Sequence, residues 1–207
     1  DLIKENYKNL IPTNIKSISY SDSSTGGSTG IPLKFLLDKN SWSFINANNI
    51  FNWEKTSYLF GDKYIALGST SLNISRSASL KHFLFYKIKN KIGFDGINMS
   101  DENCETCLQL IIKQNISYIY GYASAIFLLA KYVITNDIKI NIKICFPTSE
   151  ILTDLYRDTI IEAFNCEIVN CYGASDGGIT AFEHKRGFFN VGYNTIVNLR
   201  HRDCNNN

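Results

Sequence analysis

Residues 116–172 read ISYIYGYASAIFLLAKYVITNDIKINIKICFPTSEILTDLYRDTIIEAFNCEIVNCY, and this stretch decides the fold. Three β-rich runs alternate in it with two stretches whose apolar residues recur at helical spacing. In chain order these are 116–120, 122–136, 140–146, 149–164 and 167–172. Strands that alternate with helices predict parallel pairing, because each helix crosses over and returns the chain to the same edge. The predicted fold class is therefore α/β, with a mainly parallel sheet flanked by helices.

The pattern continues on both sides of this stretch. A helix at 101–114, with Ser100 or Asp101 as its cap, precedes it. Further upstream, KYIALGS at 63–69 is typical of another strand. After Gly178 come the short β-rich runs ITAFEH, FFNV and NTIVNL. These predict a short antiparallel β region, because turn residues separate them.

Three segments follow the carboxyl ends of the predicted strands, and all are rich in small or polar residues. They are GYAS at 121–124, PTSE at 147–150 and GASDGG at 173–178. In open parallel sheets, ligands bind in the crevice beyond the carboxyl ends of the strands. Small residues also let the backbone approach a ligand closely. We therefore expect these segments to line one site, and we expect Ser149 to begin the helix at 149–164.

The composition excludes two classes of partner. Apolar residues make up 44% and charged residues 19% of the 207 residues, which is typical of a folded globular chain. The formal net charge is +2, whereas a nucleic-acid surface needs clustered Lys and Arg. The longest apolar run, at 125–134, is broken by Lys131 and is too short to cross a bilayer. We expect neither a nucleic-acid partner nor a membrane span.

The cysteines indicate a reducing, cytoplasmic compartment. Cys145 and Cys171 lie in runs that are typical of buried strands, where a reduced Cys behaves as a small hydrophobic residue. Cys104 and Cys107 are three residues apart on a predicted helix, so both thiols share one face. No second CxxC completes a zinc site, and a structural role is therefore the favoured interpretation.

Residues 21–35 read SDSSTGGSTGIPLKF, and several interpretations compete for them. One is a flexible Ser/Gly linker, although Pro32 fixes the backbone instead of loosening it. A Walker loop needs GxxxxGK[ST] and a dinucleotide loop needs GxGxxG, and the spacing fits neither. The third is a different phosphate-binding loop, in which glycine N–H groups and side-chain hydroxyls converge on an anion. Its residues are Thr25, Gly26, Gly27, Ser28, Thr29 and Gly30.

Residues 24–34 resemble the signature loop of the adenylate-forming superfamily, which includes acyl-CoA synthetases, adenylation domains and luciferases. GGSTGIPLKF is most similar to the phenylacetate–CoA ligase branch, and within it to the capsular-polysaccharide-biosynthesis type. Further stretches resemble this branch in the same order: WEKTSYLFGDK at 53–63, GYASAIFLLAKYV at 121–133, and FPTSEILTDLYRDTIIEAFNCEIVNCYGASDGG at 146–178. The likeness covers about residues 20–200.

The resemblance implies a ligase that joins a small-molecule carboxylate to the α-phosphate of ATP and releases pyrophosphate. Such enzymes usually pass the acyl group on to CoA or another thiol. The loop at 24–34 would clasp the β- and γ-phosphates, with Thr29 and Lys34 as catalytic residues. Adenine would stack on Tyr172. The implied nucleotide-binding residues are Ser24, Thr25, Gly26, Gly27, Ser28, Thr29, Gly30, Ser149, Glu150, Tyr172, Gly173, Ala174 and Ser175.

Two of these assignments have plainer alternatives, and one departs from the family pattern. Tyr172 also fits a core aromatic residue that ends a strand, and Ser149 with Glu150 also fits an ordinary helix start. In the family, the last residue of the Tyr-Gly motif is a Glu that helps to hold Mg²⁺; here it is Asp176. Asp is an equally hard oxygen ligand but one methylene shorter, so coordination needs a closer backbone or an intervening water. Asp176 is the predicted metal ligand and third catalytic residue.

Two features of the family have no match in this sequence. Relatives carry an Arg-x-Gly-Asp-type motif that binds the ribose, and then a hinge and a small C-terminal domain. The tail HRDCNNN at 201–207 resembles neither. We therefore expect residues 1–207 to form a single, incomplete N-terminal ATP-binding domain that is inactive in isolation. The alternatives are a non-catalytic nucleotide- or acyl-binding module of the same fold and an unrelated α/β binding protein.

Overall fold

The structure is a computed structural model that describes residues 2–24, 33–69, 87–174, 178–193 and 195–198. Within these ranges the helices are α1 (Leu2–Glu5), α2 (Lys39–Trp53), α4 (Asp101–Gln114), α5 (Ala123–Thr135) and α6 (Asp154–Phe164), with 3₁₀ turns at Tyr7–Leu10 and Ile15–Ser17. The strands are β1 (Tyr20–Ser24), β2 (Lys34–Asp38), β3 (Tyr64–Gly68), β4 (Lys91–Asp95), β5 (Tyr118–Tyr122), β6 (Ile144–Thr148), β7 (Glu167–Ile168), β8 (Asn170–Ala174), β9 (Gly178–Lys185) and β10 (Phe188–Val191).

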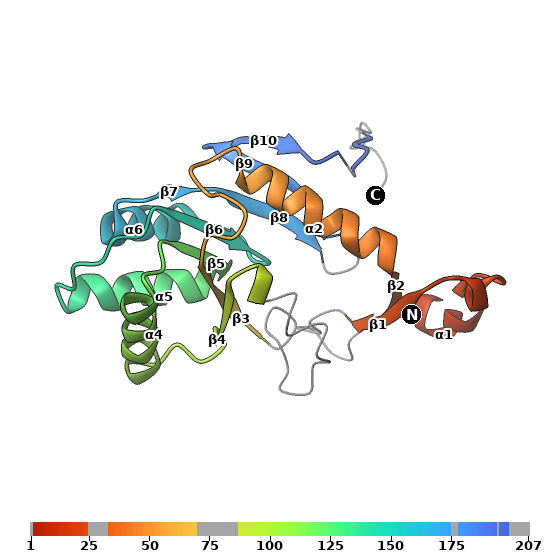
Figure 1. Cartoon of the computed structure of the whole chain (residues 1–207), viewed down its shortest axis with the longest axis horizontal. Helices are drawn as coiled ribbons and strands as arrows, with labels where there is room; N and C mark the ends of the chain where they lie inside the picture. Colours follow the sequence, from red (N-terminus) through yellow and green to blue (C-terminus); the bar gives the residue numbers. More distant parts are fainter. Residues whose placement is uncertain (1, 25–32, 70–86, 175–177, 194, 199–207) are drawn as a thin grey trace, which may run out of the picture.

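One sheet organises most of the molecule (Figure 1). Its strand order is β10-β9-β8-β6-β5-β3-β4, with β7 beside β6. Strands β4, β3, β5, β6, β7 and β8 are parallel, whereas β9 and β10 are antiparallel additions at one edge. The predicted α/β class, with its short antiparallel region after residue 178, is confirmed.

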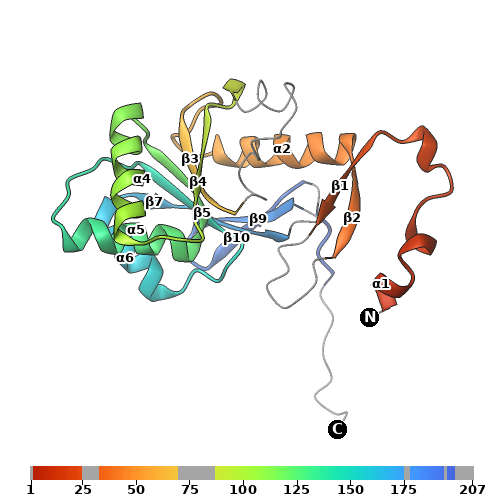
Figure 2. The ribbon, with the colours of Figure 1, turned by 90° about the horizontal axis from the view of Figure 1, so that it is seen from below.

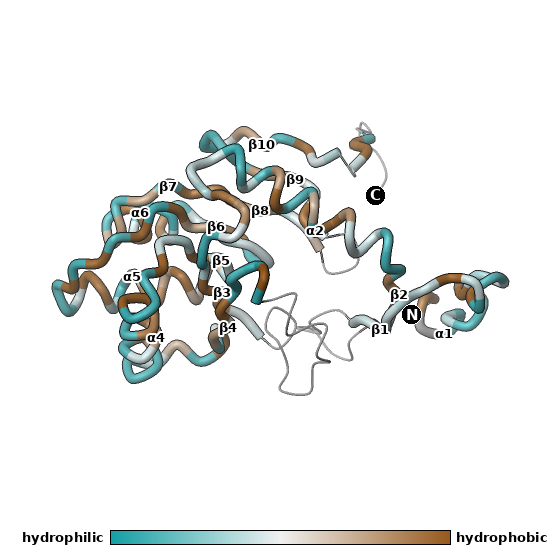
Figure 3. The backbone as a smooth tube through the Cα atoms, viewed as in Figure 1, coloured by the Kyte–Doolittle hydropathy of each residue, from teal (hydrophilic) through white to brown (hydrophobic). Residues whose placement is uncertain are grey.

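Helices cover the two faces of the sheet differently. Figure 2 shows α4, α5 and α6 on one face and α2 across the strands on the other. Figure 3 shows that the central strands carry many of the hydrophobic residues. We call the face under α4–α6 the aliphatic face; its buried residues include Ile65, Leu67, Ile119, Ile126, Leu129, Cys145 and Ile160. We call the face under α2 the aromatic face; its buried residues include Trp53, Tyr58, Tyr64, Tyr118, Phe146 and Phe182.

The predicted helices at 101–114 and 122–136 are confirmed as α4 and α5. Ser100 caps α4, because its side chain accepts a hydrogen bond from the backbone N–H of Asn103 (3.4 Å). The predicted starts of the next two strands are too early: β5 begins at Tyr118 and β6 at Ile144. Ile116 follows α4 and closes its last turn, since its N–H donates to the carbonyl of Ile111 (3.0 Å).

The prediction that Ser149 begins a helix is wrong. α6 begins at Asp154, and Thr153 is its N-cap, with a side chain that accepts from the N–H of Tyr156 (3.2 Å). Ser149 lies in the loop after β6 and has a φ of 67°, in the left-handed region. Both Ser149 and Thr153 are suitable caps by residue type, and both are followed by an acidic residue. Thr153 has the extended backbone that an N-cap requires, whereas the left-handed backbone of Ser149 does not fit that position.

The antiparallel region is smaller than predicted. ITAFEH and FFNV lie in β9 and β10, but residues 195–198 of NTIVNL form no strand. The N–H of Thr195 donates to the carbonyl of Gly192 (3.0 Å), so a turn follows β10 instead of a further strand. Among the described residues, no helix is long and apolar enough to cross a membrane.

Candidate functional site

The carboxyl ends of four parallel strands meet at one edge of the sheet. Leu67 of β3 is in register with Gly121 of β5. Thr148, the last residue of β6, is in register with both Tyr122 of β5 and Cys171 of β8. The segments that follow these strands therefore begin side by side. This is the edge at which open parallel sheets bind their ligands.

Side-chain hydrogen bonds join these strand ends to one another. The hydroxyls of Ser69, just after β3, and Tyr122, at the end of β5, are 2.8 Å apart. The Thr148 hydroxyl donates to the carbonyl of Cys171 in β8 (3.1 Å). These bonds fix the relative positions of the strand ends before any ligand is present.

Ser149 and Glu150 occupy the loop between these ends, and both are exposed. A carboxylate oxygen of Glu150 accepts a hydrogen bond from the N–H of Ser124 in the first turn of α5 (2.8 Å). A helix N-terminus favours negative charge, so Glu150 caps α5 from a neighbouring loop. Ser149 is held in the left-handed conformation, and non-Gly residues in this conformation cluster at functional sites. The loop of Ser149 and Glu150 is thus held by the hydrogen bond to α5 and by its own left-handed turn, and it does not begin a helix.

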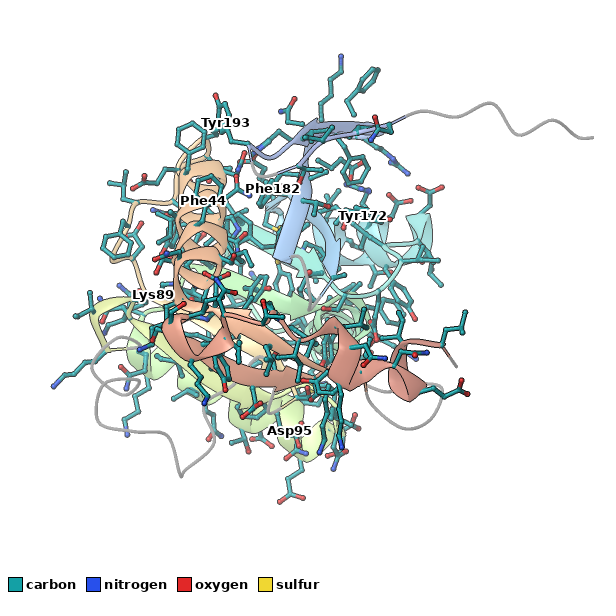
Figure 4. The ribbon with its side chains drawn as sticks, turned by 90° about the vertical axis from the view of Figure 1, so that its right-hand side faces the viewer. Phe44, Lys89, Asp95, Tyr172, Phe182 and Tyr193 are labelled. Atoms are coloured by element: carbon teal, nitrogen blue, oxygen red, sulfur yellow. The ribbon has the colours of Figure 1, made fainter. Side chains whose placement is uncertain are left out.

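Tyr172 is 68% exposed, so the alternative that it is a core aromatic residue is wrong. Its ring makes an edge contact with Phe189 of β10, with ring centroids 6.4 Å apart. Its backbone is held as well, because the hydroxyl of Thr180 donates to the Tyr172 carbonyl (3.2 Å). Figure 4 shows Tyr172 well apart from the exposed aromatic residues Phe44 and Tyr193. A supported but exposed ring of this kind is suited to stacking on a flat ligand.

The glycines of this turn allow close backbone approaches. A Cβ added to Gly173 would lie 2.2 Å from the carbonyl oxygen of Gly178, so no other residue fits there without a shift. Gly178 has a φ of 73°, and an added Cβ would lie 2.5 Å from Ile45 of α2. The missing side chain of Gly173 thus makes room for the backbone of β9. Ala174, the last residue of β8, is exposed.

The Ser/Thr/Gly-rich loop is closed by a β-hairpin. β1 and β2 pair antiparallel, with Ser24 opposite Lys34 at the mouth of the loop. Lys34 is exposed. This pairing on both sides of the loop argues against a linker between independent parts. Residues 25–32 themselves lie outside the described ranges.

α2 connects this hairpin to the sheet. Asp38, the last residue of β2, caps α2 by accepting from the N–H groups of Asn40 (2.9 Å) and Ser41 (3.0 Å). Further along α2, the Asn48 amide donates to the carbonyl of Ile179 at the start of β9 (3.2 Å). Figure 1 shows the hairpin on the side toward which β8 points, and Figure 2 shows it at the end of the molecule away from α4–α6. The flanks of the two candidate nucleotide loops therefore lie on one side of the molecule.

Several predicted site residues lie outside the described ranges. They are Thr25, Gly26, Gly27, Ser28, Thr29, Gly30, Ser175 and Asp176. In the part of the chain that the structure describes, no group of three or more His, Cys, Asp or Glu side chains is arranged to hold a metal ion. The assignment of Asp176 to Mg²⁺ stays a prediction.

The structure also shows residues that the sequence analysis missed. Arg157 of α6 and Glu183 of β9 form a buried ion pair (2.5 Å). Glu183 also accepts from the N–H of Gly187 in the β9–β10 turn (2.6 Å). This cluster anchors β9, the strand that pairs with the Tyr172 turn. An Arg in a helix and a Glu in a strand, 26 positions apart, carry no pairing signal in a single sequence.

Cys104 and Cys107 lie in the core, which fits the structural interpretation. Both are buried against the aliphatic face, and burial raises the pKa of the Cys107 thiol to about 12. On the other face, Lys89 donates to the side-chain oxygen of Asn46 in α2 (2.7 Å), and burial lowers its pKa to about 8. Figure 4 shows Lys89 beside α2, away from Tyr172.

None of the protein-family models compared matches the chain. Protein CapK of Staphylococcus aureus is 27% identical over 175 residues, which are 84% of this chain and 39% of CapK. This chain therefore spans about two fifths of the length of that curated relative.

Solved structures share the fold at low sequence identity. A 2-hydroxyisobutyryl-CoA ligase in complex with 2-HIB-AMP and CoA matches with a TM-score of 0.60 and 17% identity, over 87% of this chain and 40% of its own. VinN in complex with L-aspartate matches with a TM-score of 0.55 and 14% identity, over 78% and 38%. A luciferase-like enzyme from the mealworm Zophobas morio matches with a TM-score of 0.53 and 14% identity, over 81% and 36%. The chain thus shares the fold of part of these enzymes, which agrees with the fold that the resemblance to the adenylate-forming superfamily implied.

Proposed function

We propose that this chain supplies the ATP-binding part of an adenylate-forming ligase that activates a small-molecule carboxylate. One observation carries the proposal: the ends of the Ser/Thr/Gly-rich hairpin and of the Tyr172 strand lie on one side of the molecule, joined through α2. A triphosphate nucleotide needs both parts, because its phosphates require converging donors and its base requires a flat surface.

In this proposal a carboxylate oxygen attacks the α-phosphorus of ATP, and pyrophosphate leaves. The protein contributes mainly position and charge stabilisation to such a reaction. Thr29 and Lys34 would donate to the phosphates from the loop that begins at Ser24, and Tyr172 would stack on adenine. Glu150 is already hydrogen-bonded to α5, so its part would be to hold the loop that carries Ser149 rather than to bind the nucleotide alone.

The metal and the acceptor are further parts of the proposal. Mg²⁺ would supply charge neutralisation at the phosphates, with Asp176 as its carboxylate ligand. CoA would accept the acyl group, and the likeness to a ligase solved with CoA supports this choice. The likeness to CapK supports the phenylacetate–CoA ligase branch of capsular-polysaccharide type as the subtype. The free cysteines of the described residues, most of them buried, support a reducing, cytoplasmic location.

Nucleotide binding is tested with two exposed tyrosines. Tyr172 is 68% exposed and Tyr193 is 81% exposed, and each makes one edge contact with a phenylalanine, so neither substitution by Ala should unfold the chain. We expect ATP to raise the melting temperature of the wild type and of Tyr193→Ala. Tyr172→Ala should bind ATP about 5- to 150-fold more weakly, which is the usual range for a lost base–aromatic stack. Equal ATP affinity in both variants would remove Tyr172 from the site, and no binding by the wild type would contradict the proposal.

Catalysis is tested in the longer protein of which this chain would be the ATP-binding part. Pyrophosphate release that depends on an added carboxylate should be lost when Gly27 is replaced by Val, because a side chain there would obstruct the converging N–H groups. ATP binding without any carboxylate-dependent pyrophosphate release would favour the non-catalytic binding module instead.

A further inference from the structure

Two thiols from different elements meet at the opposite end of β6 from the candidate site. Cys145 is the second residue of β6 and is fully buried, whereas Cys166 precedes β7 and is half-buried. Their sulfur atoms are 3.7 Å apart. Both are free thiols in the structure.

The backbone around this pair is held firmly. β6 and β7 are parallel neighbours, with Cys145 in register with Ile168. The N–H of Glu167 donates to the carbonyl of Lys143 (3.0 Å), and the N–H of Val169 donates to the carbonyl of Cys145 (3.0 Å). The sulfur–sulfur separation of 3.7 Å must shorten by about 1.7 Å to reach the disulfide bond length. The two sulfur atoms are thus already in van der Waals contact between paired strands.

We propose that Cys145 and Cys166 form a reversible intramolecular disulfide in response to a small-molecule disulfide such as oxidised glutathione. In the first step, the Cys166 thiolate attacks one sulfur of the small disulfide, and the other sulfur leaves as a thiolate. In the second step, the Cys145 sulfur attacks the Cys166 sulfur, its proton passes to the departing small thiolate, and the second small thiol leaves. The two protein thiols are oxidised, and one small disulfide is reduced to two thiols.

The order of the two steps follows from accessibility. Cys145 is inaccessible to a glutathione-sized molecule, and its burial raises the pKa of its thiol well above the usual value. Cys166 is partly exposed at the turn after α6, so it is the thiol that reagents reach first. Once Cys166 carries the mixed disulfide, Cys145 can react with it directly and does not need to contact a reagent from solution.

The bond would close the segment 145–166, which contains the loop after β6 and all of α6. Closing a segment of this length restricts the unfolded chain, and we expect the melting temperature to rise by about 5–10 °C. The loop of Ser149 and Glu150 lies within the segment, so its motion would be restricted as well. The proposal concerns thiol chemistry alone and holds whether or not the chain binds ATP.

The test is to incubate the full chain with oxidised glutathione and to measure its intact mass without reductant. We expect the loss of two hydrogen atoms and a linked pair of peptides that contain Cys145 and Cys166. The Cys145→Ser variant should stop at a glutathione adduct on Cys166, and Cys166→Ser should form neither the adduct nor the bond at this site. Cys171→Ser is the matched control, because Cys171 is also a buried strand cysteine; it should still form the bond.

The outcomes are distinct. A Cys145–Cys166 link that dithiothreitol reverses, together with the higher melting temperature, supports the proposal. A wild-type adduct on Cys166 that never resolves, a link that maps to other cysteines, or thiols that all remain open to alkylation after unfolding would each overturn it. None of these readouts involves a nucleotide, so they do not depend on the fate of the proposed function.

Discussion

The two faces of the sheet are built on different principles. The aliphatic face is filled by Ile, Leu, Val and Cys side chains and is covered by three helices, α4, α5 and α6. The aromatic face is covered by α2, whose buried residues are Asn48, Asn52 and Trp53, while its Phe44 and Phe51 remain exposed. Trp53 stacks on Phe146 with ring centroids 4.3 Å apart. The aliphatic face is an ordinary hydrophobic core, whereas the aromatic face combines stacked rings with buried polar side chains of α2.

The difference lies in what each face has to position. The helices on the aliphatic face follow parallel strands as crossovers, and apolar burial alone orients them well enough. α2 instead carries the β1–β2 hairpin, and its place along the sheet is set by directional contacts. The Asn48 amide of α2 donates a hydrogen bond to the carbonyl of Ile179, and the Ile45 side chain of α2 lies against Gly178. Hydrogen bonds and stacked rings specify register more strictly than aliphatic contacts do.

The largest effect is expected at the centre of the aromatic face. Trp53→Ala removes a ring that also contacts Tyr58 and Tyr64, and it should lower the free energy of unfolding by about 4 kcal/mol. On the other face, Ile126→Ala should cost about 3 kcal/mol. Urea denaturation of both variants measures the difference. If Trp53→Ala cost less than Ile126→Ala, the rings would not be the main support of their face.

The next effect concerns the ion pair that fastens α6 to β9. Arg157→Met leaves the buried Glu183 carboxylate without its partner and should cost about 3 kcal/mol or more. The double variant Arg157→Met/Glu183→Leu should recover much of this loss, because the unpaired charge is gone. The matched control is Arg186→Met, since Arg186 pairs with Asp154 at the exposed surface. We expect a change below about 1 kcal/mol there; equal losses at Arg157 and Arg186 would contradict the assignment.

A smaller loss is expected from the tie between α2 and β9. Asn48→Ala removes the donor to the Ile179 carbonyl and should cost about 2 kcal/mol, as is usual when a buried acceptor is left unsatisfied. The exposed Asn141 is the control, and its replacement by Ala should be nearly neutral. Chemical denaturation decides between them. A neutral Asn48→Ala would mean that ring stacking alone positions α2.

The smallest effect is a dependence on pH that has opposite signs on the two faces. On the aliphatic face, Cys107 keeps its proton up to a pKa of about 12, whereas the unfolded chain ionises near 9.0. The unfolded state therefore binds fewer protons in this window, and stability falls as the pH rises from 9 toward 12. The loss from this thiol is on the order of 1 kcal/mol at pH 10, and Cys107→Ala should remove it.

Lys89, beside α2, should show the reverse dependence. Its pKa of about 8 in the folded chain lies below the usual 10.5, so its contribution to stability grows as the pH rises from 8 to 10.5. Lys89→Met should abolish this gain in stability. The stability of the variant should therefore fall more steeply with rising pH than that of the wild type. Stability measured at pH 8 and pH 10 for both variants gives the two slopes. Slopes of the same sign would contradict the contrast between the faces.

The regular part of the fold was predictable because periodicity reports burial directly. The ends of α4 and α5 were predicted to within one residue, whereas the predicted starts of β5 and β6 were two and four residues too early. The start of α6 was mispredicted, because Ser149 and Thr153 are equally good caps by type and only the loop conformation after β6 separates them. The ion pair of Arg157 with Glu183 was invisible, because pairing between distant elements leaves no pattern in one sequence.

The sequence by itself determined the parallel α/β architecture and the motifs that resemble adenylate-forming ligases, since both depend on local composition and spacing. The tertiary structure decided that Tyr172 is exposed, that Glu150 caps α5, and that the hairpin and the Tyr172 strand lie on one side of the molecule. These are relations between elements far apart in the chain. They arise from the packing of α2 and the pairing of β8 with β9, in which each residue responds to neighbours that its own local sequence does not contain.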